Sequence, residues 1–437
     1  MKILITLLTL LIFNSCSSTK LVTSRPESNY SFSIIQGTTT EDSTIIRVIY
    51  PRKLKVNYIV TDDQNKNIPV KKVKSFKKSY SEFKVEHIKV TGLDVNNTYT
   101  LKINSDNKRW SDERTFKSLN TQKEDLKILI ASCMSDAFNE IGNVIWPKAF
   151  SHEPDVTFLI GDNLYADTYA GIYLGKDYPA NPKHLWNRYV GHAMVMKIYR
   201  MKHLTPTYVT WDDHDYGQND GGKDYRYKSQ SKRILNIFFP REKSLNHIFG
   251  PGVSTKLQLG GMNFLFLDGR SYRSTKKNKS GSHFGKRQKK WIHKNLDPKK
   301  FNWLISGDQF FGGYHQWESF EGNHPETFKK FIQGLRDSRS KVSFISGDRH
   351  LIEVMKIPKS QLGYKTYEYT VSGIHTKMYP GSLERDPNPN RVGGFDGLPN
   401  YAILTTKYLY DEVNVKFEAY SIKGLELSSE HEISLKL

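Results

Sequence analysis

Six short apolar runs in this sequence share one feature: a side chain that can bind a metal ion or a proton follows the end of each run. Such runs, separated by longer amphipathic segments, are typical of the buried strands of an α/β fold. Ligands bind beyond the carboxyl ends of these strands, so we expect the side chains to meet at one edge. The pairs are Leu126–Ser132 with Cys133, Val156–Ile160 with Asp162, Thr207–Trp211 with Asp212 and Asp213, Asn263–Leu267 with Asp268, Trp303–Ser306 with Asp308, and Val342–Ser346 with Asp348.

The amphipathic segments between these runs predict helices, and further β-branched runs predict strands near the C-terminus. This order predicts an α/β fold with layered sheets flanked by helices. The expected helices are Asn139–Phe150, His184–His203, Lys286–Asn295 and Glu326–Arg336, the expected late strands are Tyr367–Ser372, Tyr401–Tyr408 and Val413–Ile422, and residues 376–400, rich in Gly, Pro and Asn, are expected to form a loop.

Residues 30–119 have a different texture, with short alternating runs separated by Asp, Asn and Gly. This pattern predicts a small all-β sandwich. The stretch Val90 to Leu93, followed by Tyr99, resembles a corner of fibronectin type III-like domains. The expected strands are Tyr30–Gln36, Ser43–Tyr50, Val56–Thr61, Glu82–Val90, Thr98–Ile103 and Arg114–Lys117.

The N-terminus predicts export. Met1 and Lys2 form a positive start, and Ile3 to Phe13 is an apolar core too short to span a bilayer. Cys16 follows, as in a bacterial lipoprotein processing site, although an ordinary signal peptide is the alternative. We therefore expect a lipoprotein-type signal at 1–16, a tether at 17–29, the β domain at 30–119 and a catalytic domain at 124–437, anchored to a membrane through lipidated Cys16 in the cell envelope, periplasmic or at the outer membrane.

The chain is basic, with 65 Lys plus Arg against 45 Asp plus Glu and a net charge of +20. A basic excess favours anionic partners, but most of these lysines are scattered, as on an ordinary solvated surface. The densest patches are Lys71–Lys78 and Lys286–Lys290.

One Asp after a strand is ordinarily a turn residue or a helix cap, and we expect that role for Asp268 and Asp308. Six such positions are harder to explain as turns, because acids packed at one edge repel one another unless cations neutralise them. We therefore predict a site with more than one metal ion. Carboxylates suit hard ions such as Ca²⁺, imidazole suits Zn²⁺ or iron, and a thiolate with a phenolate favours ferric iron.

Cys133 and Tyr165 can supply that thiolate and phenolate, and Asp162 lies three residues before Tyr165. The alternatives are a small buried hydrophobic residue for Cys133 and a half-buried aromatic for Tyr165. In the late motif, Asp348 and His350 point the same way if the segment is extended, so that both can bind metal.

His214 can act as a general acid towards a leaving alkoxide, bind metal, or be held structurally by Asp213 or Asp215. Arg270 is a candidate phosphate clamp, because its planar fork suits phosphate, and a salt bridge to Asp268 is the alternative.

Taken in order, these motifs resemble the PhoD-type alkaline phosphatases of the calcineurin-like metallophosphoesterases. The resemblance covers roughly residues 124–410, and residues 30–118 are similar to the domain that precedes the catalytic one in that family. The motifs are Ser132-Cys133, Gly161-Asp162-Asn163-Leu164-Tyr165-Ala166-Asp167, Trp211-Asp212-Asp213-His214-Asp215 with Asn219-Asp220, Leu267-Asp268-Gly269-Arg270-Ser271-Tyr272-Arg273, and Gly347-Asp348-Arg349-His350.

The resemblance implies a two-sheet αββα sandwich whose metal centre holds Fe³⁺ and Ca²⁺. It implies that Cys133, Asp162 and Tyr165 bind the iron and that Asp162 bridges to a second ion. Asp213 would bind the second metal, Asp348 and His350 match the late metal motif, and His214 matches the histidine near the leaving group.

The expected activity is hydrolysis of phosphate monoesters outside the cytoplasm by a metal-bound hydroxide. One alternative is a phosphodiesterase or phospholipase D-like activity on the same centre. The expected partner is a small-molecule or lipid phosphoester substrate, and nucleic acid is expected only as a substrate. The other is a non-catalytic surface lipoprotein stabilised by metal. The sequence does not fix the oligomeric state.

Overall fold

The computed structural model describes residues 32–106, 110–169, 172–173, 179–409 and 412–434. The predicted signal and tether, with Cys16, lie outside the described residues. Among the described residues, no helix is long and apolar enough to cross a membrane. The fold is mixed α/β, as predicted.

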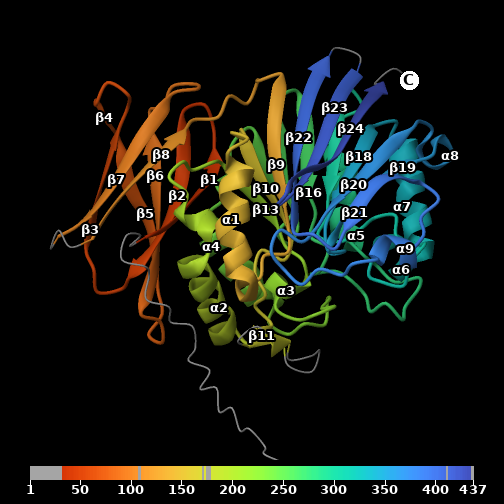
Figure 1. The fold of residues 1–437 in the computed structure, drawn as a ribbon, viewed down its shortest axis with the longest axis horizontal. Coiled ribbons are helices and arrows are strands. Elements are labelled where there is room, and N and C mark those ends of the chain that lie inside the picture. Colours follow the sequence, from red (N-terminus) through yellow and green to blue (C-terminus); the bar gives the residue numbers. More distant parts are fainter. Residues whose placement is uncertain (1–31, 107–109, 170–171, 174–178, 410–411, 435–437) are drawn as a thin grey trace, which may run out of the picture.

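Residues 33–117 form two four-stranded antiparallel sheets, drawn in red and orange at one end of the molecule in Figure 1. The sheets share a core that contains Val48, Ile88, Leu101 and Phe116. One sheet has the order β1-β2-β6-β5 and the other β4-β3-β7-β8, with β1 Ser33–Thr39, β2 Ser43–Pro51, β3 Val56–Thr61, β4 Asn67–Ile68, β5 Val70–Lys77, β6 Phe83–Thr91, β7 Thr98–Ser105 and β8 Ser111–Lys117.

A six-stranded sheet carries the first three predicted apolar runs, as β9, β10 and β13. These three strands are parallel, so their carboxyl ends share one edge. The sheet order is β13-β10-β9-β22-β23-β24, with β9 Asp125–Ala131, β10 Val156–Ile160, β13 Thr207–Thr210, β22 Asn400–Leu409, β23 Glu412–Ser421 and β24 Gly424–Ser434.

An eight-stranded sheet carries the other three runs, as the parallel neighbours β16, β17 and β18. Its order is β14-β15-β16-β17-β18-β20-β19-β21, with β14 His247–Phe249, β15 Thr255–Leu259, β16 Met262–Phe266, β17 Phe301–Ile305, β18 Lys341–Ser346, β19 Leu351–Ile357, β20 Thr366–Val371 and β21 Arg391–Asp396; a short pair, β11 Thr168–Tyr169 and β12 Ile172–Tyr173, lies apart from it.

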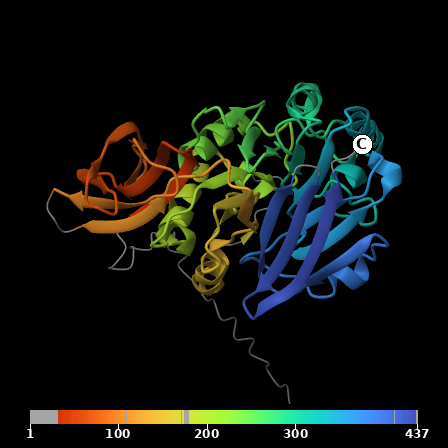
Figure 2. The same ribbon diagram turned by 90° about the horizontal axis from the view of Figure 1, so that it is seen from above.

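The two large sheets pack face to face. One hydrophobic core cluster between them contains Phe158 of β10 and Phe264 and Trp303 of the eight-stranded sheet. Helices cover the outer faces: Trp146 of α1 and Trp186 of α2 pack on the six-stranded sheet, and α5 and α7 pack on the other. Figures 1 and 2 show α1, α2 and α4 between the N-terminal strands and these sheets. The helices are α1 Asn139–Phe150, α2 Pro182–Val195, α3 Asp213–Tyr216, α4 Lys228–Phe238, α5 Gly285–Asn295, α6 Phe320–Asn323, α7 Pro325–Asp337, α8 Lys359–Leu362 and α9 Ser382–Arg385, with 3₁₀ turns at Asp136–Phe138 and Lys197–Arg200.

Two of the predicted secondary-structure segments are wrong in part. The helix expected at His184–His203 ends at Val195, because Met196 is extended and a 3₁₀ turn follows before β13. The loop expected at 376–400 contains α9 and the edge strand β21, where pairing with β19 overrides the low strand propensity of Gly393 and Gly394.

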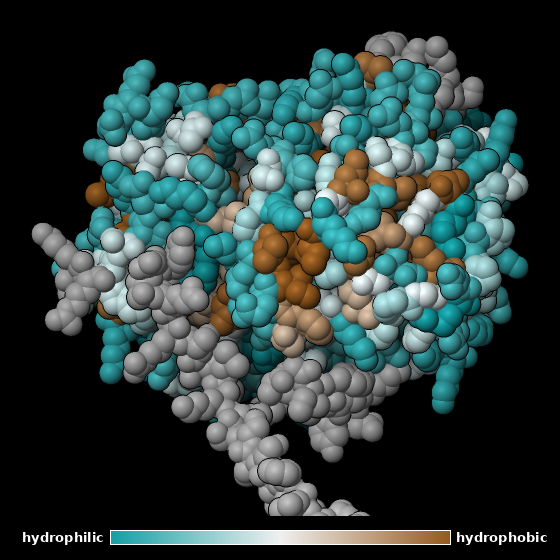
Figure 3. Space-filling model, viewed as in Figure 1, coloured by the Kyte–Doolittle hydropathy of each residue, from teal (hydrophilic) through white to brown (hydrophobic). Residues whose placement is uncertain are grey.

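The Lys71–Lys78 patch is largely the edge strand β5, which the sequence did not predict. Lysines on an edge strand discourage pairing with another chain. They also replace the alternating apolar residues by which a strand is predicted from the sequence. The face drawn in Figure 3 is mostly hydrophilic, and its central brown area lies over α1, where Val144 is 51% exposed.

We expect Phe158→Ala to lower the free energy of unfolding by about 3–5 kcal/mol, because Phe158 is fully buried against Tyr208, Phe264 and Phe266. The control Val144→Ala should change it by less than about 0.5 kcal/mol. Denaturant titration of both variants measures the difference, and equal effects would contradict the shared core of the two sheets.

Candidate metal centre

Three overlapping groups of acidic and histidine side chains lie where the parallel strands end. Within each group, one possible ligand atom of every residue lies within 4.8 Å of the others. Asp213 belongs to all three groups and Asp162 to two, so the groups form one continuous cluster. The groups are Asp162 with Asp213 and His214; Asp162 with Asp212, Asp213 and Asp348; and Asp213 with Asp220 and Glu318.

Two glycines let the two sheets meet at this cluster. A Cβ atom on Gly161, which has a φ of +115°, would lie 2.8 Å from Cβ of Asp212, and one on Gly307 would lie 2.6 Å from the same atom. Any side chain there would separate the loop after β10 from the loop after β17. Asp212 is therefore enclosed between the two sheets.

Asp215 fixes the loop that carries Asp212 and Asp213. Its Oδ1 accepts the Asp212 N–H at 2.7 Å, and its Oδ2 accepts the backbone N–H of Asn163 at 3.1 Å. It thereby ties the ends of β10 and β13 together and caps the short helix α3.

Backbone strain is concentrated in the cluster. Nine described residues other than glycine have a positive φ, and five of them are candidate site residues: Cys133, Asp162, Asp220, Asp348 and His350. Left-handed backbone is costly for such residues and gathers at functional sites. The extended segment on which the shared direction of Asp348 and His350 depended is not found, because both residues have left-handed backbone.

Cys133 is buried and unpaired at the end of β9. Its Sγ lies 3.6 Å from Oδ2 of Asp162 and 3.3 Å from the Ser372 hydroxyl. Burial raises the pKa of the Cys133 thiol to about 12, and the nearby charge of Asp348 adds to this. A cation in contact with the sulfur would reverse that effect.

Tyr165 joins the first motif to the last. Its hydroxyl lies 3.1 Å from Nε2 of His350, and its ring packs on His214 with 4.1 Å between centroids. Nδ1 of His350 lies 2.7 Å from the Lys377 carbonyl, which fixes the proton on Nδ1 and turns the Nε2 lone pair towards the Tyr165 hydroxyl. Burial lowers the pKa of His350 to about 4, so Nε2 carries no proton at neutral pH.

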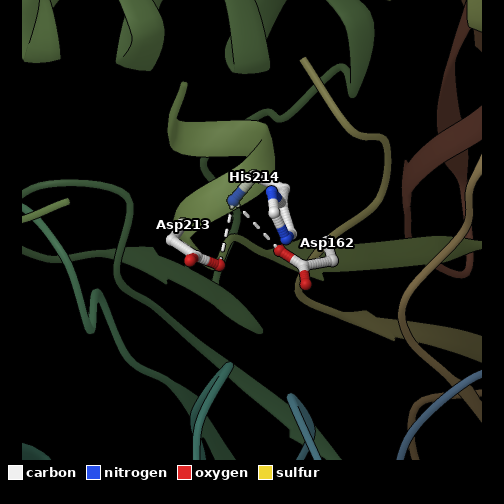
Figure 4. Close-up of side chains that lie close together, drawn as sticks. All are labelled: Asp162, Asp213 and His214. Carbon is white, nitrogen blue, oxygen red and sulfur yellow. Dashed lines mark hydrogen bonds between the residues drawn. The ribbon is translucent and has the colours of Figure 1, made fainter. Parts of the chain in front are cut away.

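His214 is held from two sides. Its backbone N–H donates to Asp162 and Asp213 (Figure 4). Its Nδ1 lies 2.8 Å from Oδ1 of Asp167. The second ring nitrogen points towards Asp162 in this view. Burial lowers the pKa of His214, but Asp213, Asp162 and Asp167 together raise it well above its usual range.

Arg270 is fully buried among acids. Its Nε donates to Asp212 at 2.5 Å, Nη1 donates to Glu318 at 2.6 Å, and Nη2 lies 3.7 Å from Asp213. The alternative of a salt bridge to Asp268 is wrong, since only the backbone N–H of Arg270 reaches that carboxylate. Nη2 has no hydrogen-bond partner within the described part of the chain.

Asp268 and Asp308 both have structural partners, but only Asp268 has the expected role of a turn residue. Asp268 accepts from the Trp211 indole at 2.8 Å and from loop N–H groups. Asp308 instead forms a buried ion pair with Arg273 at 2.6 Å and lies 3.3 Å from Nε2 of His283.

The cluster carries more negative charge than its cations balance. Burial raises the pKa of Asp162 and Asp348 well above the usual range and that of Asp212 to about 7. Burial also raises the pKa of Asp213, but Arg270 and His214 outweigh this and bring it below the usual range. Oδ2 of Asp212 is buried with no hydrogen-bond partner among the described residues. These donors fit metal cations, which would neutralise the excess charge.

The sequence did not assign roles to Asp167, Asp220 and Glu318 as members of the site. Asp167 and Asp220 lie in motifs that the sequence shows, several residues beyond a strand end. Glu318 gave no signal, because it lies in the loop before α6 and not after an apolar run.

We expect metal binding to release protons. Asp212, with its pKa raised to about 7, holds a proton below that pH in the metal-free protein, and a cation must displace it. The affinity of chelator-treated protein for Ca²⁺ should therefore rise as the pH rises through about 7. Calorimetry in buffers of different ionisation enthalpy measures the protons, and the exposed-site variant Asp63→Asn should behave as wild type; pH-independent binding would contradict this.

The fold is similar to the solved structure of PhoD, with a TM-score of 0.69 and 15% sequence identity over 95% of this chain and 94% of that chain. A crystal structure of amylomaltase from Corynebacterium glutamicum matches with a TM-score of 0.17 and 11% identity over 51% of this chain and 34% of that chain, which is too low to support an argument. No protein-family model and no curated protein matches the sequence. At this identity the first likeness shows the fold alone: the chain has a PhoD-like fold.

Proposed function

We propose that this protein is a metal-dependent phosphoester hydrolase of the alkaline phosphatase type. The observation that carries the proposal is His214, which Asp167 orients at 2.8 Å beside the buried carboxylates Asp162 and Asp213. A structural cation site needs carboxylates but has no use for an oriented imidazole. A hydrolase needs both, because charge must be neutralised and a leaving oxygen protonated.

In this proposal Cys133, Asp162 and Tyr165 would hold an Fe³⁺ ion, Asp213 and Asp348 would hold Ca²⁺, and His350 would be a further nitrogen ligand of the centre. When bound, the ions would neutralise phosphate charge as Lewis acids and lower the pKa of an attacking water. The soft thiolate and the phenolate suit the ferric ion, and the carboxylates suit calcium. Asp162 lies in contact distance of both sets, which supports a bridging role.

His214 would donate its proton to the leaving alkoxide. Asp167 accepts from Nδ1, which leaves the second ring nitrogen as the proton donor, and the nearby carboxylates Asp213, Asp162 and Asp167 raise the pKa of the ring. Arg270 would hold Asp212 and Glu318 in place and offer Nη2 to a phosphate oxygen.

The PhoD-like fold also supports the family arrangement, with residues 124–437 as an αββα metallophosphoesterase domain and residues 30–119 as a fibronectin III-like domain. The N-terminal sequence supports an exported lipoprotein, anchored through Cys16 on the periplasmic or outer-membrane side. In that place the substrate would be a small phosphoester or a lipid.

A phosphodiesterase on the same centre is the second candidate. The buried carboxylates and His214 serve both reactions, because a diester differs from a monoester only in a second ester group on phosphorus and can release the same leaving group. Substrate comparison is therefore the deciding measurement.

We expect purified protein loaded with iron and calcium to hydrolyse an aryl phosphate faster than a bis-aryl phosphate. Chelation should abolish both activities, and readdition of metal should restore them. Release of the aryl alcohol measures the rate. A faster diester rate would favour the phosphodiesterase, and no hydrolysis of either ester would contradict both candidates and favour a non-catalytic metal-stabilised lipoprotein.

We expect His214→Ala to lower kcat by about 10²–10⁴-fold while the iron and calcium content stays unchanged, because the variant loses a general acid and no ligand. Metal analysis and steady-state kinetics on the same sample test this. The exposed histidine of α5 provides the control His293→Ala, which should keep full activity. Loss of metal in His214→Ala would instead make His214 a ligand.

A further inference from the structure

Three aromatic side chains stand among the described large hydrophobic residues that are strongly exposed: Tyr80, Trp317 and Tyr379, at 40%, 53% and 43%. Exposed aromatic rings cost hydrophobic free energy, and grouped exposed apolar surface marks interaction sites. Tyr80 lies in the N-terminal strand region. The other two contact the residues around the candidate metal centre.

Trp317 is connected to the residues of the candidate metal centre through one carboxylate oxygen of Asp386. Its indole N–H donates to Oδ2 of Asp386 at 3.0 Å, and Nη2 of Arg349 donates to the same atom at 2.8 Å. Arg349 stands between Asp348 and His350, and Trp317 directly precedes Glu318 of the third acidic group. The indole is thus held by its polar edge while more than half of its surface stays exposed.

Tyr379 is attached to the centre through a ring contact. Its phenol ring stacks on the imidazole of His350, with 5.5 Å between centroids and 12° between planes. Nζ of Lys377 lies 5.3 Å from the centre of the Tyr379 ring. Three consecutive residues thus make three different contacts. Asp348 belongs to the acidic group, Arg349 binds the Asp386 carboxylate that also holds Trp317, and His350 stacks on the Tyr379 ring.

We propose that Trp317 and Tyr379 form a subsite for the leaving group of the substrate, and that this group carries a nucleobase. The inference rests on the proposed hydrolase function and names its substrate class: phosphate esters of nucleosides. Trp317 and Tyr379 keep 53% and 43% of their surfaces exposed, and each is connected to the segment 348–350, Trp317 through Asp386 and Tyr379 by its contact with His350. In the proposal, the organic part of an ester bound at the metal centre lies against these two rings.

The surroundings favour a nucleobase over an acyl chain. Arg349, Asp386 and Lys377 are charged, and an acyl chain gains nothing from charged neighbours. A nucleobase has a flat apolar face for stacking and polar edges for such neighbours. Stacking of a base on one aromatic ring is typically worth a factor of about five or more in affinity.

The test compares adenosine 5′-monophosphate with ribose 5-phosphate, two esters with the same leaving oxygen that differ in the base alone. Wild type should show the higher kcat/KM for the nucleotide. Trp317→Ala and Tyr379→Ala should each lower kcat/KM for the nucleotide about fivefold or more, chiefly through KM, and leave ribose 5-phosphate unchanged. Trp317→Phe should retain most of the preference, and Tyr80→Ala should leave both substrates unchanged.

Equal losses on both substrates, or no preference in wild type, would overturn the subsite. Adenosine binding measured by calorimetry tests the subsite without turnover: binding by wild type that weakens in Trp317→Ala supports it, and no binding by wild type overturns it. Adenosine binding without hydrolysis of either ester would contradict the proposed function and leave the subsite standing, so the two failures are distinguishable.

Discussion

The arrangement of the candidate metal centre depends on the mutual repulsion of four buried carboxylates. Asp162, Asp212, Asp213 and Asp348 offer oxygens within 4.8 Å of one another in a buried place. Arg270 balances part of this charge from one side and His214 balances part from the other. Such a group of buried carboxylates destabilises the folded protein unless a cation binds to it. This is the physical basis for a candidate metal centre here.

The architecture explains how the carboxylates come together. β9, β10 and β13 end at one edge of their sheet, and β16, β17 and β18 end at the facing edge of the other. Gly161 and Gly307 allow these edges to touch around Asp212. Left-handed backbone at Asp162 and Asp348 then turns the side chains out of the strand direction. The strain is offset by the packed sheets beneath, where Phe158 and its neighbours are fully buried.

The sequence was sufficient to predict the acids that follow apolar runs, because a buried parallel strand is a strong pattern and its end is a fixed place in the fold. It was not sufficient for Glu318, which reaches the site from a loop through its contact with Arg270. The edge strand β5 was hidden by its lysines, and β21 by its glycines, because pairing with a neighbour decides both. The partner of Arg270 was also beyond the sequence, since Asp268 is nearer along the chain but Asp212 is nearer in space.

The most direct test of the metal centre is crystal diffraction from metal-loaded protein, with anomalous data collected on both sides of the iron absorption edge. The account predicts an iron peak bound by Cys133, Asp162 and Tyr165 and a second, calcium peak bound by Asp213 and Asp348. Absence of both peaks from this cluster, or an iron atom bound without Cys133, would contradict it.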